Sequence, residues 1–286
     1  MKLCVTADDF GLHPATNRGI VRLAAAGAID AVSVMAHAGA ALAELPHLVR
    51  TGVAIGVHLV FVEERPLQAT PALQRLLDRA GNLPKDWRIL ALRLAARPWL
   101  AAALATEAAA QVHHLRGMGI KVAFVNSHQH VHMLPALWRV LAPWLSDLGV
   151  AVRAVPFSRS QLTKTTGLKQ WMLDAAGMVS TTARPLPPHV PILRPIGLDA
   201  AGHLDARSFH RLLKRASTTN YAATTTVELV VHPGDEDASL RAAYGHWRYH
   251  WAAERDVLLA AHADGIAASL GWTRHSPQPA AETSCP

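Results

Sequence analysis

The chain contains very little cysteine. Cys4 and Cys285 are its only two cysteines in 286 residues. They stand near opposite ends and form no Cys-x-x-Cys pair, which excludes a disulfide framework and a cysteine-based zinc site. Free thiols are typical of a reducing compartment, so we expect a cytoplasmic protein.

Long uncharged apolar runs are also missing. The run that follows Met1 is ended by Asp8 and Asp9, which makes it too short for a signal peptide. The longest apolar region, 91–110, contains two arginines and a glutamate. It therefore predicts a buried or amphipathic helix and not a membrane span.

The sequence has no block of like charges. Lys and Arg number 28 against 21 Asp and Glu, a formal net charge of +7. This excess would suit an anionic partner, but the basic residues are scattered and match no nucleic-acid-binding signature. We expect no nucleic-acid partner. Peripheral contact with the inner face of an anionic membrane is an open alternative. A homodimer is another.

What the chain does contain is enough apolar sequence for one large core, since half of its residues are hydrophobic and 17% are charged. Short β-rich runs alternate with longer helical segments. The expected strands are 2–7, 31–36, 53–60, 121–127, 149–155, 190–196, 226–232 and 265–271. The expected helices are 14–27, 39–51, 97–118, 134–148, 206–218 and 238–264. This alternation predicts an α/β fold with a parallel sheet, and eight strands predict a (β/α) barrel, complete or distorted.

Two connections are longer than a simple crossover requires. They span 61–96 and 156–190, and insertions of this length are usually functional or disordered. We expect one barrel domain over 1–272. Residues 273–286 show no periodicity, which predicts a disordered tail.

Polar residues gather where the expected strands end. Since the active site of such a barrel lies at the carboxyl ends of its strands, one rim should receive carboxylates and imidazoles. These residues are Asp8, Asp9, His58, Asn126, His128, His130 and His232. The stretch VNSHQHVHML would place Asn126 and the histidines at 128, 130 and 132 on one face of an extended strand. This set suits one divalent ion, zinc first, with magnesium, manganese or cobalt as alternatives.

Five motifs carry a family resemblance. They are TADDFGLHPATNRGI at 6–20, GVHL at 56–59, NSHQHVHMLP at 126–135, VRAVP at 152–156 and VELVVHPG at 227–234. On these motifs the chain resembles the YdjC-like carbohydrate deacetylases, which include chitooligosaccharide deacetylases. Within this family, its Trp-containing insertions and the sequence SHQHVHMLPALW are most similar to those of the hopanoid-biosynthesis-associated branch. That branch is linked to deacetylation of an N-acetylglucosaminyl group on a hopanoid lipid.

The resemblance also implies roles for individual residues. Asp9, His58 and His128 would hold the metal, Asp8 would be the catalytic base and His232 the acid. Asn126 stands where the family often has Asp, and it can hydrogen-bond to a ligand imidazole without adding charge. His130 would bind substrate or support the ligands. Arg153 would orient Asp8, hold substrate or serve a structural ion pair.

We therefore expect a metal-dependent hydrolase that removes the N-acetyl group from an N-acetylglucosamine-type sugar linked to a hopanoid lipid. Three alternatives are a deacetylase of soluble chitooligosaccharides, a barrel amidohydrolase or phosphoesterase with two metals, and a non-catalytic carbohydrate-binding barrel. Trp87, Trp99 and Trp171 lie in or beside the insertions. They would either hold an apolar group beside the sugar or cover the barrel helices.

Overall fold

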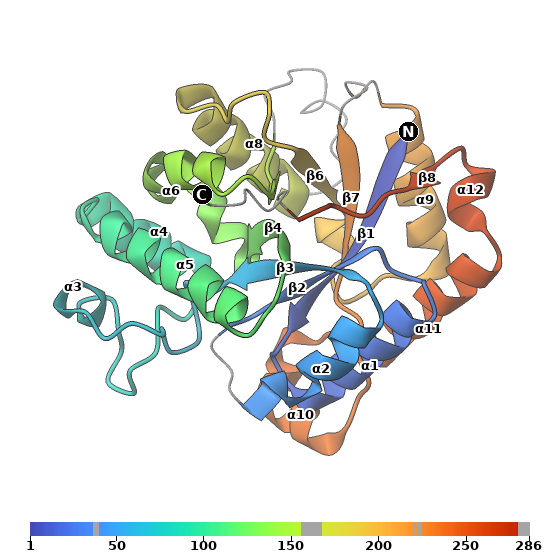
Figure 1. The fold of residues 1–286 in the computed structure, drawn as a ribbon, viewed down its shortest axis with the longest axis horizontal. Helices are drawn as coiled ribbons and strands as arrows, with labels where there is room; N and C mark the ends of the chain where they lie inside the picture. The colour runs from blue at the N-terminus through green and yellow to red at the C-terminus, as the bar shows by residue number, and fades with distance from the viewer. Residues whose placement is uncertain (37–39, 156–167, 220, 222–224, 280–286) are drawn as a thin grey trace, which may run out of the picture.

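The computed structural model describes residues 1–36, 40–155, 168–219, 221 and 225–279 (Figure 1). In this part of the chain seven parallel strands close into a barrel, because β2 pairs with β1 as well as with β3. The strands are β1 (Lys2–Phe10), β2 (Ala31–Val34), β3 (Ala54–Leu59), β4 (Val122–Ser127), β5 (Ala151–Arg153), β6 (Ile192–Ile196) and β7 (Thr226–Val231). The single-domain (β/α) barrel is confirmed, with seven strands in the ring.

The strand expected at 265–271 is wrong. Its middle is the short helix α12 (Ile266–Ser269), flanked by Gly265 and Gly271 at φ angles of 62° and 78°. Alanine is the strongest helix former, and glycine adopts positive φ at low cost, so this composition fits a helical turn better than a strand.

The expectation that the disordered tail begins at residue 273 is also wrong. Residues Thr273–Arg274 form β8, which pairs in parallel with Lys2 and Leu3 of β1. Because β7 occupies the other edge of β1 and β2 pairs only from Thr6 onward, β8 covers an edge that would otherwise lack partners. Of the remaining expected tail, residues 275–279 form no helix or strand, and 280–286 lie outside the described residues.

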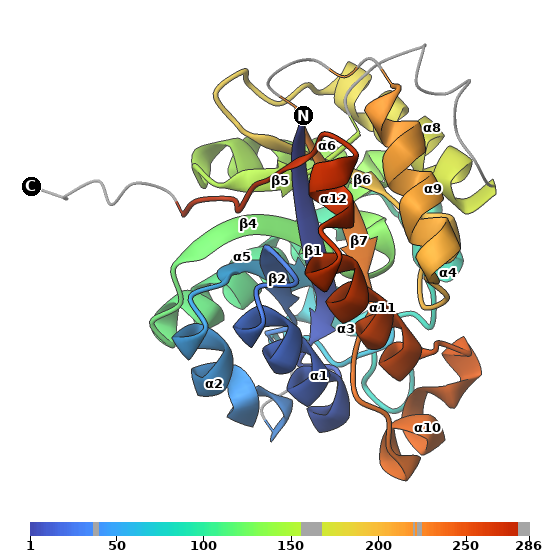
Figure 2. The same cartoon turned by 90° about the vertical axis from the view of Figure 1, so that its right-hand side faces the viewer.

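Helices surround the barrel, as Figures 1 and 2 show from two sides. Those near their expected positions are α1 (Pro14–Ala25), η1 (Ala40–Glu44), α2 (Leu45–Arg50), α5 (Leu100–Gly117), α6 (Pro135–Asp147) and α9 (Ala206–Ser217). The long helix expected at 238–264 is divided into α10 (Ala238–Tyr244), η4 (Gly245–Trp247) and α11 (Trp251–Ala263). The break falls at Arg248, which has a φ of 59° and cannot continue a right-handed helix.

The insertions contain helices that the sequence analysis does not predict. These are α3 (Pro71–Gln74) and α4 (Trp87–Ala96) in the first and α8 (Leu168–Ala183) in the second. Two short turns follow strands, η2 (His128–Met133) after β4 and η3 (Leu198–Ala200) after β6. Asp86 caps α4 by accepting hydrogen bonds from the backbone N–H groups of Arg88 and Ile89.

The barrel interior is apolar at one end and polar at the other. Cys4, Phe124 and Leu193 belong to one buried apolar cluster. Gly56 of β3 leaves room for the Phe124 ring, which a Cβ at this position would strike. The polar side chains lie further along the strands, toward their carboxyl ends.

Candidate metal centre and active-site cavity

Asp9, His58 and His128 form a compact group of metal-ligating atoms. Asp9 Oδ1 lies 3.1 Å from His58 Nε2 and 3.0 Å from His128 Nδ1. All three residues are buried, and no other group of three such residues in the described part of the chain brings its ligating atoms so close together. One carboxylate and two imidazoles suit zinc and related divalent ions, so the sequence-predicted ligands lie together as a site requires.

A local irregularity of β1 turns Asp9 toward the two histidines. The register between β1 and β2 shifts between Ala7 and Phe10, and Asp9 has a φ of 64°. A bulge of this kind redirects one side chain without breaking the strand, and strained residues of this type cluster at functional sites. Asp8 and Asp9 can therefore both contribute to one rim although they are adjacent in sequence.

The electrostatics of the group favour positive charge. Burial alone would raise the pKa of Asp9, but His128 and His58 outweigh it and hold the pKa well below its usual range. Burial opposes a charged His128, yet the carboxylates of Asp9 and Glu63 raise its pKa to about 10. A buried position that holds a proton so strongly is also suited to a metal cation.

Hydrogen bonds orient His58 for coordination. Asn126 donates from Nδ2 to Asp8 Oδ1 at 3.0 Å, so its Oδ1 faces His58 Nδ1 at 2.7 Å. An amide oxygen only accepts, which assigns the ring proton to Nδ1 and leaves the Nε2 lone pair directed at Asp9 and the metal position. Asn126 is therefore placed to hydrogen-bond to the imidazole of His58, and the role of His58 as a metal ligand stays a prediction.

Arg153 binds Asp8 on one side and Glu228 on the other. It donates to Asp8 from Nη1 at 2.6 Å and Nη2 at 2.9 Å, and to Glu228 from Nε at 2.6 Å and Nη2 at 2.9 Å. Burial would raise the pKa of Asp8, but Arg153 and then His58 outweigh it and lower this pKa well below its usual range. Arg153 is thus ion-paired with two buried carboxylates, one of which is Asp8, and its role in catalysis stays a prediction.

The three histidines of VNSHQHVHML do not share one face. β4 ends at Ser127, and within η2 Gln129 and His130 have left-handed φ angles of 51° and 55°. His132 is consequently turned away from the site. Its Nδ1 lies 2.6 Å from Ser127 Oγ, and its Nε2 donates to the backbone oxygen of Arg153 at 2.7 Å.

His130 and His232 face the active-site cavity from different strands' ends. In the described part of the chain neither Nδ1 has a hydrogen-bond partner, and both rings line the cavity. Burial lowers the pKa of each imidazole, so both are neutral near pH 7. The backbone N–H of His232 donates to Glu254 at 2.8 Å, which fixes the segment that follows β7.

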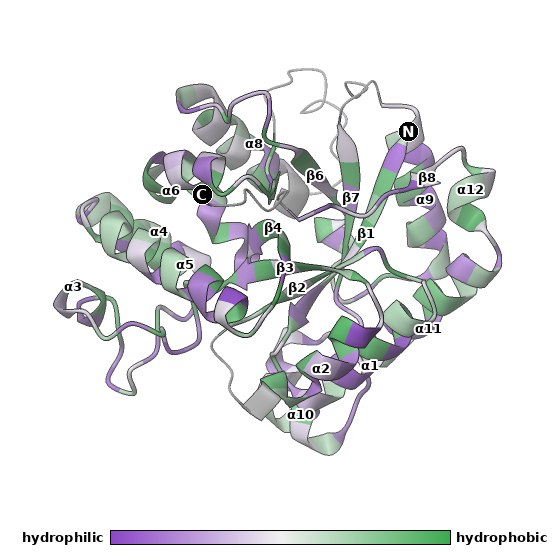
Figure 3. Ribbon diagram, in the orientation of Figure 1, coloured by the Kyte–Doolittle hydropathy of each residue, from purple (hydrophilic) through white to green (hydrophobic). Residues whose placement is uncertain are grey.

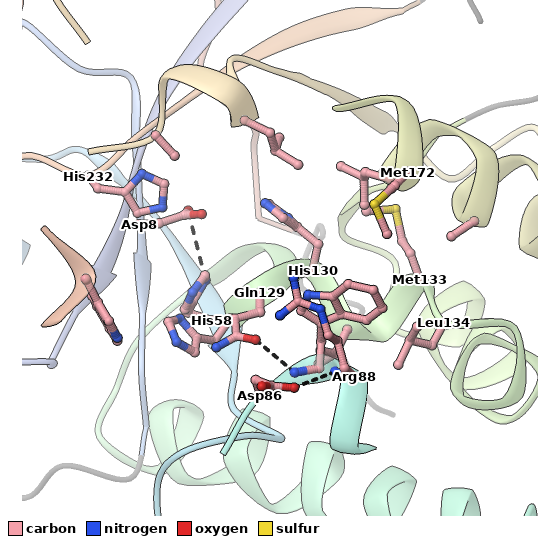
Figure 4. Close-up of a pocket in the computed structure, with 18 of the residues that line it drawn as sticks. Asp8, His58, Asp86, Arg88, Gln129, His130, Met133, Leu134, Met172 and His232 are labelled. Carbon is pink, nitrogen blue, oxygen red and sulfur yellow. Dashed lines mark hydrogen bonds and ion pairs between the residues drawn. The ribbon is translucent and has the colours of Figure 1, made fainter. Parts of the chain in front are cut away.

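A cavity of about 530 Å³ lies above the metal group. In Figure 4, Asp8, His58 and His232 occupy one side, while Met133, Leu134 and Met172 lie together on the other. Further apolar residues line the cavity, namely Val131, Leu173, Ala176, Leu198 and Ala201. The cavity thus has a polar end and an apolar end.

Aromatic side chains cover the polar end. The Trp247 ring lies 5.4 Å from the His128 ring, and the Tyr249 ring lies 5.2 Å from His232. Both line the cavity. Gly202 leaves the space that Tyr249 fills, since a Cβ there would strike its ring.

Of the three tryptophans considered from sequence, only Trp87 lines the cavity. Trp99 and Trp171 are half-exposed elsewhere, and Arg75 covers the Trp99 ring. A role for these two inside the site is therefore wrong. Trp99 precedes α5, beyond the end of α4, and α8 presents Met172, Leu173 and Ala176 to the cavity instead of Trp171.

Sequence reasoning misses four residues of the site. They are Ser33, Glu63, Glu228 and Glu254. Ser33 Oγ donates to Asp8 Oδ1 at 2.7 Å, and Glu63 Oε2 lies 2.8 Å from His128 Nε2. A signal existed for Glu228, a charged residue inside an apolar strand and four positions before His232 on the same face. Glu63 follows β3 directly, at the same rim.

Comparisons with known proteins agree with this geometry. The sequence profile of the family described as YdjC-like protein matches residues 2–267. The chain is 32% identical over 154 residues to the chitooligosaccharide deacetylase of Escherichia fergusonii, a match that spans 53% of this chain and 58% of that relative. It is 29% identical over 253 residues to the carbohydrate deacetylase of Mus musculus, covering 82% and 78% of the two chains.

A longer match joins the chain to the chitooligosaccharide deacetylase of Klebsiella pneumoniae, with 26% identity over 94% of this chain and 95% of that relative. Among solved structures, a protein of Enterococcus faecalis V583, proposed to cleave cellobiose phosphate, superposes with a TM-score of 0.70. That match covers 96% and 97% of the chains at 17% identity, which shows a shared fold.

Proposed function

The chain belongs to the YdjC-like protein family, and from this premise we propose that it is a metal-dependent N-deacetylase of an N-acetylglucosamine-type sugar. The observation that carries the proposal is the group of Asp9, His58 and His128 beside Asp8 on the polar side of the cavity. The relatives described as chitooligosaccharide and carbohydrate deacetylases support the reaction class.

Asp9, His58 and His128 would hold one divalent ion, with zinc preferred. When bound, such an ion supplies Lewis-acid polarisation of an amide carbonyl and acidification of water. Asp8 stays ionised and is held by Arg153, Ser33 and Asn126. Three of its contacts fall on Oδ1, so Oδ2, bonded to Arg153 alone, is the atom that takes a proton from the attacking water.

His232 then delivers a proton to the departing nitrogen. Because burial lowers its pKa, the imidazole is neutral in the free enzyme and acquires that proton within the cavity during the reaction. Water cleaves the amide C–N bond, its oxygen stays on the acetyl carbon and both of its protons end on the leaving nitrogen, one of them taken by Asp8 and passed on through His232. The products are acetate and a protonated amine, with no net proton gained by the protein. His130, whose Nδ1 is also unpartnered, lies where it can hydrogen-bond to the substrate.

We further propose that the substrate carries an apolar group, as a hopanoid-linked sugar does. The pyranose would lie at the polar end, against Trp247 and Tyr249, since aromatic rings pack against the apolar faces of sugars. The opposite end is lined by aliphatic and Met side chains. The aliphatic and Met side chains offer no hydrogen bonds to the hydroxyl groups of a second sugar, whereas an alkyl or ring system would bury apolar surface against them.

The segment from Trp87, which lines the cavity, to Trp99 carries exposed apolar and basic side chains. Leu92 and Trp99 are 72% and 52% exposed, and Arg88 and Arg97 are exposed on the same segment. Figure 3 shows apolar and polar residues together on α4. This mixture suits peripheral contact with an anionic membrane. No helix in the described ranges is long and apolar enough to span a bilayer.

Mass spectrometry of the purified, zinc-loaded protein tests the proposal. Free N-acetylglucosamine, chitobiose and an alkyl- or hopanoid-linked N-acetylglucosamine are supplied in parallel, with Asp8→Asn as the matched inactive control. We expect loss of one acetyl group, with the highest kcat/KM for the lipid-linked compound because apolar binding energy assists the reacting end. Higher rates on chitobiose would refute the lipid linkage but keep the deacetylase. No acetyl loss from any compound would refute the function, and two metals per chain would favour the amidohydrolase or phosphoesterase alternative.

A further inference from the structure

His128 has a carboxylate partner on each of its ring nitrogens. Its Nδ1 lies 3.0 Å from Asp9 Oδ1, and its Nε2 lies 2.8 Å from Glu63 Oε2. The Nδ1 side of the His128 ring faces Asp9, which also contacts His58. Glu63, on the Nε2 side, does not belong to the group of ligating atoms. The metal position therefore faces Nδ1, and Glu63 lies on the opposite side of the ring.

From this arrangement we infer that Glu63 is a positioning residue for metal binding, which accepts a hydrogen bond from the Nε2–H of His128 and leaves the Nδ1 lone pair free for the ion. An ionised carboxylate can only accept, so the proton of a neutral His128 must lie on Nε2. A carboxylate in this place also raises the basicity of the ligating nitrogen. The inference rests on the metal site of the proposed function.

The charges around the site support this role. Asp8 is already paired with Arg153, and Asn126, the partner of His58, is neutral. Asp9 and Glu63 then supply two negative charges, which match one divalent cation. Glu63 thus places a negative charge next to the His128 imidazole, whereas Asn126 places none next to the His58 imidazole because it is neutral.

The loop after β3 holds Glu63 in an unfavourable backbone conformation. Glu63 has a φ of 69° and is not glycine. Its backbone N–H donates to Pro84 at 2.9 Å, and Leu83 N–H donates to Glu64 at 2.9 Å. Further along the loop, the backbone N–H groups of Leu67 and Gln68 donate to the buried Glu107 of α5, each at 2.8 Å. Surroundings that enforce such strain are typical of a side chain required at one place.

Zinc affinity of the metal-free protein, measured by competition with a chromophoric chelator, tests the inference without reference to activity. We expect Glu63→Ala to weaken zinc binding about 10- to 100-fold. Glu63→Gln should weaken it less, because its amide oxygen still accepts from Nε2–H. Glu64→Ala is the matched control. It removes an adjacent carboxylate of the same loop, which accepts a hydrogen bond from Tyr244 at 3.1 Å, and should bind zinc within about twofold of the parent, since the carboxylate on His128 Nε2 stays in place.

The outcomes separate this inference from the proposed function. Parent-like zinc affinity in Glu63→Ala overturns the inference alone, and so does equal weakening in Glu63→Ala and Glu64→Ala, which would indicate loss of loop structure or of general charge. A parent protein that binds no zinc overturns both the inference and the metal-dependent function. If Glu63→Ala does not fold, Glu63→Gln decides, with parent-like affinity counting against the hydrogen bond.

Discussion

Replacement of Arg153 by Met should convert an ion-paired barrel interior into one with two uncompensated carboxylates. Arg153 is fully buried and is the shared partner of Asp8 and Glu228. Removing one member of a buried pair costs about 3–5 kcal/mol because a charge is left without a partner. We therefore expect the free energy of unfolding of Arg153→Met to fall by about this amount at pH 7.

The size of this loss should depend on pH. In the parent, the pKa of Asp8 lies below its unfolded value, so its contribution is present above about pH 4 and is lost as pH falls. Without Arg153, burial raises the pKa of Asp8 above the unfolded value, and the native state binds an extra proton. Stability then decreases as pH rises, by about 1.4 kcal/mol per pH unit. The deficit should thus be about 2–3 kcal/mol smaller at pH 5 than at pH 7.

Denaturant unfolding of metal-free protein between pH 5 and pH 8 measures this deficit. Arg153→Lys is the matched control, because it keeps the positive charge while losing the bidentate geometry. The free energy of unfolding of Arg153→Lys should be lower than that of the parent, but the size of this deficit should not change between pH 5 and pH 7. A deficit below about 1 kcal/mol in Arg153→Met would refute the electrostatic account of the barrel interior, and so would an equal deficit at pH 5 and pH 7.

Three further predictions concern the site. Asp8→Asn should keep zinc but lower turnover about a hundred-fold or more, as loss of a positioned base does, and parent-like turnover with full zinc content would remove Asp8 from the mechanism. His58→Ala should abolish stoichiometric zinc binding, while His132→Ala should keep it, since the His132 ring nitrogens are bonded to Ser127 and Arg153. Elemental analysis measures the zinc content of both variants. Equal loss of zinc would show that the ligand set is wrong. Trp247→Ala should lower kcat/KM for an N-acetylglucosaminyl substrate about five- to tenfold, because roughly 1 kcal/mol of ring packing is lost. Steady-state kinetics measures this change. Trp99→Ala, which alters a tryptophan outside the cavity, is the control, and an equal loss in this variant would show that the effect is non-specific.

The barrel could be predicted because its strands are continuous apolar runs that alternate with helical segments. The errors occur where local and tertiary preferences diverge. GIAASLG reads as a buried strand by hydrophobicity, but its alanines and its flanking glycines favour the helical turn of α12. Thr273 and Arg274 carry no periodic signal, and they form β8 because an edge of β1 at Lys2 and Leu3 is left free. Pairing of this kind depends on the completed sheet.

The ligand set could be predicted from motifs, whereas the residues that make it work could not. Asp9, His58 and His128 follow separate strands, and a parallel barrel brings those ends together whatever the loops do. His132 seemed equivalent to His128 by period, but the left-handed residues Gln129 and His130 break the extended backbone between them. Glu63 has no spacing that links it to His128, 65 positions away, because it reaches its partner from a loop whose course is set by Pro84 and Leu83. A sequence pattern can therefore group the residues of a candidate metal centre, and only the folded loops show that a second carboxylate, that of Glu63, contacts His128.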